Sequence, residues 1–251
     1  MPEQPWTLLL LAAAGLVAGT INSIAGGGSL LTLPLLIFLG LPPTVANATN
    51  RIAVFIGGIG ATMSFHKRQL IPYAWVRFGL PPALIGVVLG TWGATQIGDL
   101  AFERALAFVL VLGAGWMIWR PKNTEEGEDA PIPEGSRRYL LLLAFFGLGC
   151  YSGFIQAGVG FLFMALLSSH GLDLVRCNAV KVPLILVFAG LAMVLFAMNG
   201  LLDWTAGLSL AAGQFFGARL GVHLQVLKGQ AWVRNVLMVT IVVFAIRLLT
   251  R

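Results

Sequence analysis

The chain has 251 residues, of which 58% are hydrophobic and only 10% are charged, and its formal net charge is +6. A soluble domain carries about 25% charged residues, so this composition excludes an ordinary soluble protein and favours one that crosses a membrane several times. The Lys and Arg residues are scattered and are not interleaved with exposed aromatic residues. This pattern argues against a nucleic-acid partner and is explained better by the positive-inside rule.

The first half of the chain, residues 1–120, predicts four membrane helices and one short apolar piece. The opening apolar run follows Glu3 rather than a basic region, so we expect a membrane helix and not a cleaved signal peptide. The expected helices cover residues 6–24, 42–65, 75–96 and 100–119, and the short piece covers residues 30–39. Because about 20 apolar residues are needed to cross a bilayer, the short piece should be a half-helix or a re-entrant segment.

The second half, residues 136–251, repeats this order of segments. The expected helices cover residues 139–155, 174–198, 204–224 and 231–249, and the short piece covers residues 161–168. Residues 121–135, between the halves, are rich in proline and in charged residues, which predicts a solvated cytoplasmic linker.

A shift of the chain along itself by 131 residues (178 − 47 = 131) superimposes the two halves without a gap. Gly27 then falls on Gly158, and the step Asn47-Ala48 falls on Asn178-Ala179. Duplicated hydrophobic halves are typical of secondary transporters, in which the substrate site lies where the halves meet. The repeat therefore carries a prediction about mechanism as well as about fold.

Loop charges predict how the two halves are oriented. The basic residues 66–68 indicate a cytoplasmic loop, and the loop around Asp99 indicates an external one. In the second half the charges of the equivalent loops are reversed. Residues 199–203 hold no Lys or Arg, and the loop of Lys228 and Arg234 is basic. We therefore expect an all-α multi-pass protein of the cytoplasmic membrane. It would consist of two inverted-topology repeats, with about eight full transmembrane helices and two short broken or re-entrant segments.

Three cations are expected deep in the membrane, and no acid is. All ten Asp and Glu residues lie at helix ends, in the linker or at the N-terminus. Arg51, Lys181 and Arg219 lie inside apolar segments, where insertion of a cation costs at least ~2.5–3.5 kcal/mol. Because no acid is buried beside them, we expect a bound anion to be the partner of these cations. Alternatively, Arg51 and Lys181 reach an interface or bond to free carbonyl groups, and Arg219 lies near a basic loop.

The glycine-rich breaks are candidate parts of the same site. Residues 22–29 and 153–160 are polar or rich in glycine inside apolar runs, at matching positions of the two halves. Unwound backbone at membrane depth has to line a cavity or be buried by protein. The half-helix after each break offers free N–H groups and a positive dipole end, which suits an anion. The alternative is a plain hinge, or small residues that let helices pack closely.

Paired amides complete the candidate site. Asn47 and Asn178 each precede a deep cation by about one helical turn, so one site shared by both halves is expected. Alternatively, their side chains hydrogen-bond the broken backbone of the neighbouring segment. The candidate substrate-binding residues are Asn22, Gly26, Gly27, Gly28, Ser29, Asn47, Thr49, Asn50, Arg51, Gln156, Gly158, Asn178 and Lys181.

These residues resemble a known family. The break Asn-x-x-Ala-Gly-Gly-Gly-Ser at residues 22–29, Pro34, Gly40 and the run 46–50 are similar to the sulfite exporter TauE/SafE family. The resemblance covers nearly the whole chain and is looser in the second half, where Val159 replaces one glycine of the triplet. It implies movement of sulfur-containing anions such as sulfite, thiosulfate, sulfonates or sulfoacetate across the cytoplasmic membrane.

The function expected from the residues and the resemblance together is secondary transport of small sulfur-containing oxyanions by alternating access. An anion channel and a membrane scaffold that transports nothing are the alternatives. No nucleophile, phosphate loop or metal-binding constellation predicts an enzyme, and we expect no cofactor and no metal. Cys150 and Cys177 are expected to be small buried fillers. The expected partners are the anion and the bilayer, and a homo-oligomer is compatible with the pattern.

Overall fold

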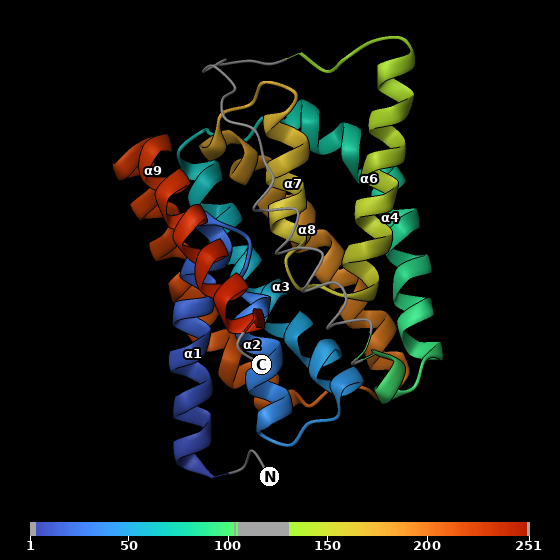
Figure 1. The fold of residues 1–251 in the computed structure, drawn as a ribbon, viewed down its shortest axis with the longest axis vertical. Coiled ribbons are helices and arrows are strands. Elements are labelled where there is room, and N and C mark those ends of the chain that lie inside the picture. Colours follow the sequence, from blue (N-terminus) through green and yellow to red (C-terminus); the bar gives the residue numbers. More distant parts are fainter. Residues whose placement is uncertain (1–3, 103, 105–130, 250–251) are drawn as a thin grey trace.

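The computed structural model describes residues 4–102, 104 and 131–249, and in these ranges the chain is helical without a β-strand. Figure 1 shows the helices as an elongated bundle, with two short helices among the long ones. The helices are α1 (Pro5–Ile24), α2 (Ser29–Phe38), α3 (Pro43–Lys67), α4 (Tyr73–Gln96), α6 (Ser136–Phe154), α7 (Val159–Ser168), α8 (Leu174–Met198) and α9 (Trp204–Leu249).

The observed helices follow the predicted segments closely, with one difference at the C-terminal end. Two helices were expected over residues 204–224 and 231–249, and α9 runs through both. Its backbone leaves helical geometry at Gly229, with φ 73° and ψ −174°, so the predicted boundary persists as a kink. Most of the expected helix 100–119 and of the linker 121–135 lies outside the described residues.

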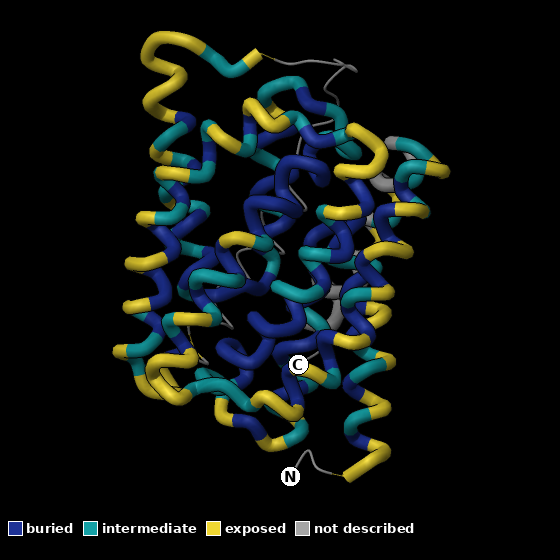
Figure 2. Tube along the Cα trace, turned by 180° about the vertical axis from the view of Figure 1, so that it is seen from behind, coloured by how far each residue is buried: buried dark blue, intermediate teal, exposed yellow. Residues whose placement is uncertain are grey.

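The helix lengths and the outer surface suit a bilayer. Helices α1, α4 and α8 are long and apolar enough to cross a membrane by length and composition, whereas α2 and α7 have ten residues each. Large apolar side chains such as Leu9, Trp92, Leu143 and Phe216 are exposed. Figure 2 shows the exposed positions along the outer sides of the bundle and the buried ones at its centre. A continuous apolar exterior of this kind is compatible with lipid around the bundle.

Two pairs of helices pack backbone to backbone, and each pair joins one half of the chain to the other. A Cβ atom on Gly217 of α9 would lie 2.0 Å from the carbonyl oxygen of Leu16 in α1. A Cβ atom on Gly86 of α4 would lie 2.2 Å from the carbonyl oxygen of Phe146 in α6. The G-x-x-x-G pairs in α4 and α9 therefore serve close packing, since any larger residue would push the helices apart.

Helices α3 and α8 form the central pair. Their first residues, Pro43 and Leu174, and their last, Lys67 and Met198, lie 131 residues apart, the same shift that superimposes the halves. Gly58 of α3 packs on Leu186 of α8, and Phe55 packs on Gly190, so the two helices run in opposite directions. Likewise, α1 begins at the bottom of Figure 1 and α6 begins at the top.

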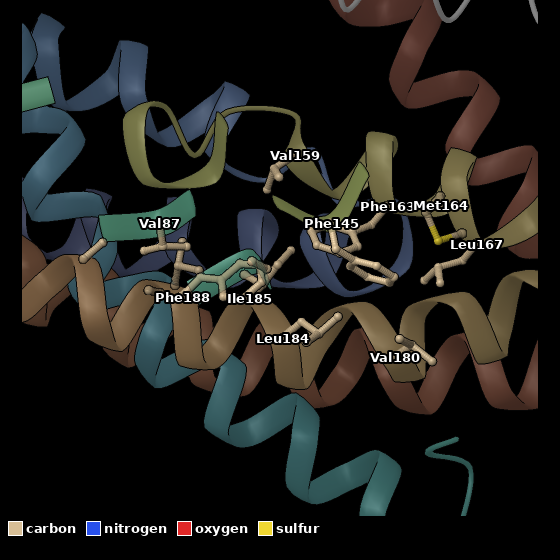
Figure 3. Packing of buried hydrophobic residues seen from close by; sticks show 14 of the residues in the cluster. Val87, Phe145, Val159, Phe163, Met164, Leu167, Val180, Leu184, Ile185 and Phe188 are labelled. Atoms are coloured by element: carbon tan, nitrogen blue, oxygen red, sulfur yellow. The ribbon is translucent and has the colours of Figure 1, made fainter. Parts of the chain in front are cut away.

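The short helix α7 is held by the largest apolar core. Phe163 of α7 packs on Phe145 of α6 and on Phe188 of α8, and Met164 and Leu167 belong to the same buried cluster (Figure 3). Burial of one such side chain contributes about 1.5–3 kcal/mol, which fixes a helix of ten residues that would not be stable alone.

Side-chain contacts show which segments lie at each end of the bundle. At one end, an Arg68 guanidinium nitrogen lies 3.0 Å from Nδ1 of His223, which joins the C-terminus of α3 to α9. At the other end, the Thr44 hydroxyl donates to Asp99 at 2.6 Å, and the Asp203 N–H donates to Thr49 at 2.9 Å. The basic loop after α3 and the two acids Asp99 and Asp203 thus lie at opposite ends.

Candidate functional site

The two helix breaks meet at the centre of the bundle. A Cβ atom on Gly26 would lie 2.4 Å from Cα of Gly160, so the backbones of the two breaks are in direct contact. In the two breaks, Gly26 (φ +86°) and Gly158 (φ +72°) have a left-handed backbone conformation, which glycine adopts without strain. The superposition pairs Gly158 with Gly27, so the turn in the first break falls one residue earlier than the repeat predicts.

Arg51 of α3 is fully buried and binds the end of α6. Its Nη1 donates to the carbonyl oxygen of Ser152 at 2.5 Å and to Oε1 of Gln156, and its Nη2 donates to the carbonyl oxygen of Gly153 at 3.0 Å. Asn47, one turn earlier, donates from Nδ2 to the carbonyl oxygen of Phe154 at 3.0 Å. Together they satisfy the last carbonyl groups of α6, which have no partner inside the helix.

Lys181 of α8 does the same for the end of α1. Its Nζ donates to the carbonyl oxygen of Asn22 at 3.0 Å and to Oδ1 of Asn178 at 2.5 Å. Asn178 in turn donates to the carbonyl oxygen of Ile24 and to Oε1 of Gln225, both at 2.8 Å. The Gln225 amide donates to the carbonyl oxygen of Ser23 at 3.2 Å, so three successive carbonyl groups are bound.

The two clusters are reciprocal, because each half caps a broken helix of the other half. A cation at a helix C-terminus is stabilised by the negative end of the helix dipole. Carbonyl groups are neutral, however, and among the described residues no carboxylate lies within ion-pair distance of Arg51 or Lys181. The centre of the bundle therefore keeps two positive charges that hydrogen bonds stabilise but that no acid neutralises.

Other predicted site residues are divided between this centre and the rest of the bundle. Asn50 donates to the Ser29 hydroxyl at 3.0 Å and accepts from the Thr32 hydroxyl at 2.7 Å, so it holds the start of α2. The Thr49 side chain faces the start of α9 instead, where its hydroxyl accepts a hydrogen bond from the Asp203 N–H. Thr49 is thus held at the end of the bundle, apart from the two cations.

Arg219 differs from Arg51 and Lys181, because it is not buried in the bundle. Its side chain is exposed, and its guanidinium lies 5.5 Å from the ring centroid of Phe215. The sequence places it inside an apolar segment, but only packing decides which face of a helix turns outward. The stem of Arg219 packs near α3, since a Cβ atom on Gly60 would lie 3.2 Å from its Cγ, but its side chain as a whole is exposed.

The sequence reasoning missed several polar residues that the structure places in or beside these clusters. Thr32 and Ser152 contact the predicted residues directly, and Gln225 extends the cap on α1. Gln214 is buried one turn before Ala218 in α9, and within the described part of the chain its Oε1 has no hydrogen-bond partner. A Gln inside an apolar helix is itself a signal, because a buried amide needs partners.

A helical protein whose two broken helices meet beside buried cations has the architecture found in membrane transporters. Residues 11–248 match the sequence model of the sulfite exporter TauE/SafE family, so the chain belongs to that family. The chain is accordingly a multi-pass membrane transporter.

Curated relatives agree with this assignment. The chain is 28% identical to a "Probable membrane transporter protein" of Haemophilus influenzae, over 92% of this chain and 90% of the relative. It is 29% identical to "Probable membrane transporter protein YfcA" of Escherichia coli, over 98% and 91%. It is 26% identical to "Probable membrane transporter protein YjnA" of Bacillus subtilis, over 84% and 87%. No solved structure matches the fold.

Proposed function

We propose that the protein is a secondary transporter of small sulfur-containing oxyanions, such as sulfite, thiosulfate or sulfonates, and that it works by alternating access. The observation that carries this proposal is the reciprocal capping of the broken helices by Arg51 and Lys181. Two unneutralised charges in a low-dielectric interior attract an anion strongly. The family to which the chain belongs supports a sulfur oxyanion as the substrate.

The capping bonds also connect anion binding to movement. Each cation sits on one half and its carbonyl partners sit on the other, so rocking of one half against the other has to break these bonds. An anion at the interface could replace the carbonyl groups as partner of a cation at that moment. Its binding would then lower the free-energy barrier between the two conformations, which is what alternating access requires.

The proposed topology is a pair of inverted repeats in the cytoplasmic membrane. It is supported by the opposite directions of α3 and α8 and by the opposite starting ends of α1 and α6. The excess of Lys and Arg in the loops after α3 and near Lys228 orients both toward the cytoplasm.

A labelling experiment tests this topology. In a chain with Cys150 and Cys177 replaced by alanine, single cysteines are placed at Lys67, Lys228 and Asp203. An impermeant thiol reagent added to intact cells is expected to label only position 203, and positions 67 and 228 only after the membrane is opened. Labelling of positions 67 and 203 from the same side would contradict inverted repeats and favour a parallel duplication.

Transport itself is tested with purified protein in liposomes. Radiolabelled sulfite, thiosulfate and sulfoacetate are offered with and without an imposed proton or sodium gradient. We expect uptake of at least one of them above its external concentration, and only with a gradient. Flux that follows the anion's own gradient alone would indicate a channel, and no flux of any of these anions would overturn the proposed substrate class.

A further inference from the structure

A pocket lies beside Lys181, between α1, α3, α8 and α9, and Arg51 does not line it. Its lining includes Asn22, Ser23, Gly57, Lys181, Gln214 and Ala218. The Lys181 ammonium has three N–H donors, and two of them are held by Asn22 and Asn178. The third donor remains for an occupant of the pocket.

Gln214, like Asn22 and Ser23, is a polar residue that lines this pocket. It is 3% exposed, and no described residue donates a hydrogen bond to its buried Oε1. A Cβ atom on Gly57 of α3 would lie 2.7 Å from Cγ of Gln214, so a glycine at that position makes room for the amide. A buried polar group without a partner is unfavourable, and a ligand in the pocket would remove that penalty.

The two halves differ at these positions. In the superposition of the two halves by 131 residues, Gln214 corresponds to Ala83, Ser23 to Phe154 and Gly57 to Phe188. Phe188 is buried in the core with Val87, the residue that corresponds to Ala218 (Figure 3). Two phenylalanines thus occupy the positions of Ser23 and Gly57, and an alanine replaces the polar Gln214. The site is therefore not symmetric, although the capping clusters are.

We propose that the transported anion binds in the pocket beside Lys181, with the Lys181 ammonium and the Gln214 amide as its ligands, and that Arg51 serves as a structural cap. This inference rests on the proposed anion transport and makes its site more specific. A carboxamide offers a donor end and an acceptor end whichever way it is turned. The pocket therefore presents a cationic donor and an amide, which match the hydrogen-bonding groups of a small, singly charged oxyanion that keeps one O–H group, as hydrogensulfite does.

Equilibrium binding of radiolabelled sulfite to the purified full-length protein tests this proposal, at a mildly acidic pH at which hydrogensulfite is the main species. Methanesulfonate, which has the same charge but no O–H donor, is the comparison probe. We expect Gln214→Leu to weaken sulfite binding about tenfold and methanesulfonate binding clearly less, because only hydrogensulfite has an O–H group to donate to the amide oxygen. We expect Lys181→Gln to weaken the binding of both anions by at least tenfold.

Arg219→Gln is the matched control, since it removes an exposed cation little more than one helical turn from Gln214. This variant should bind both anions as the wild type does. Gln214→Leu should also keep the wild-type melting temperature or raise it, because it removes a buried acceptor without a partner. Wild-type sulfite affinity in Gln214→Leu would overturn the pocket as the binding site and leave the proposed transport standing. Failure of the wild-type protein to bind either anion would overturn the proposed substrate class, and the pocket with it.

Discussion

Replacing Arg51 by leucine is expected to destabilise the protein strongly and to abolish transport. The leucine variant leaves the carbonyl groups of Ser152 and Gly153 buried without their donors. Each such group costs about 1–3 kcal/mol, so we expect the free energy of unfolding to fall by roughly 2–5 kcal/mol. From the sequence alone, removal of an unpaired buried cation is expected to stabilise the protein, because it relieves a desolvation penalty. The observed hydrogen bonds of Arg51 predict the opposite, a loss of stability.

The conservative variant Arg51→Lys is the control. A lysine keeps the charge and can bind one or two of the carbonyl groups, as Lys181 does in the other half. We expect a smaller loss of stability and partial transport. Thermal unfolding in detergent and sulfite uptake at matched protein levels are the measurements. A leucine variant with the wild-type melting temperature would show that the cap on α6 contributes nothing to stability.

Gly26→Ala is expected to be the most damaging single-methyl change at the breaks. The left-handed backbone at φ +86° costs a non-glycine residue about 1–2 kcal/mol. The added Cβ would also meet the backbone of Gly160 at 2.4 Å, and overpacking of this kind typically costs a further ~1–3 kcal/mol. Because this contact joins the two breaks, we expect loss of transport together with a lower melting temperature.

Gly158→Ala separates strain from contact. Its backbone is also left-handed, at φ +72°, but the nearest atom to the added Cβ would be 3.6 Å away. It should therefore lose stability through strain alone and be the milder variant. Gly147→Ala, with no atom within 4 Å, should match the wild type in melting temperature and uptake. Equal losses for Gly26→Ala and Gly158→Ala would mean that the contact between the breaks is unimportant.

The sequence by itself determined the class of protein and most of the helices. Segment lengths, the Gly and Pro residues at their ends and the low charge depend on the local chain and on the solvent, so they can be read without tertiary structure. The prediction of a helix over residues 174–198 is confirmed to the residue. The repeat also singled out Asn47 and Asn178, and the position of Arg51 and Lys181 inside apolar segments singled out the two cations; the structure brings all four to the two broken helix ends.

Only the tertiary structure decided what these side chains contact. The carbonyl partners of Arg51 lie about a hundred residues away in the chain, and no local pattern states which helix end will arrive beside a given side chain. The face of each helix was equally undetermined, which is why Arg219 is exposed whereas Gln214, five residues earlier, is buried beside Lys181. Helix formation depends on the local chain, but burial depends on which helices pack together, and that is fixed only when both halves close on each other.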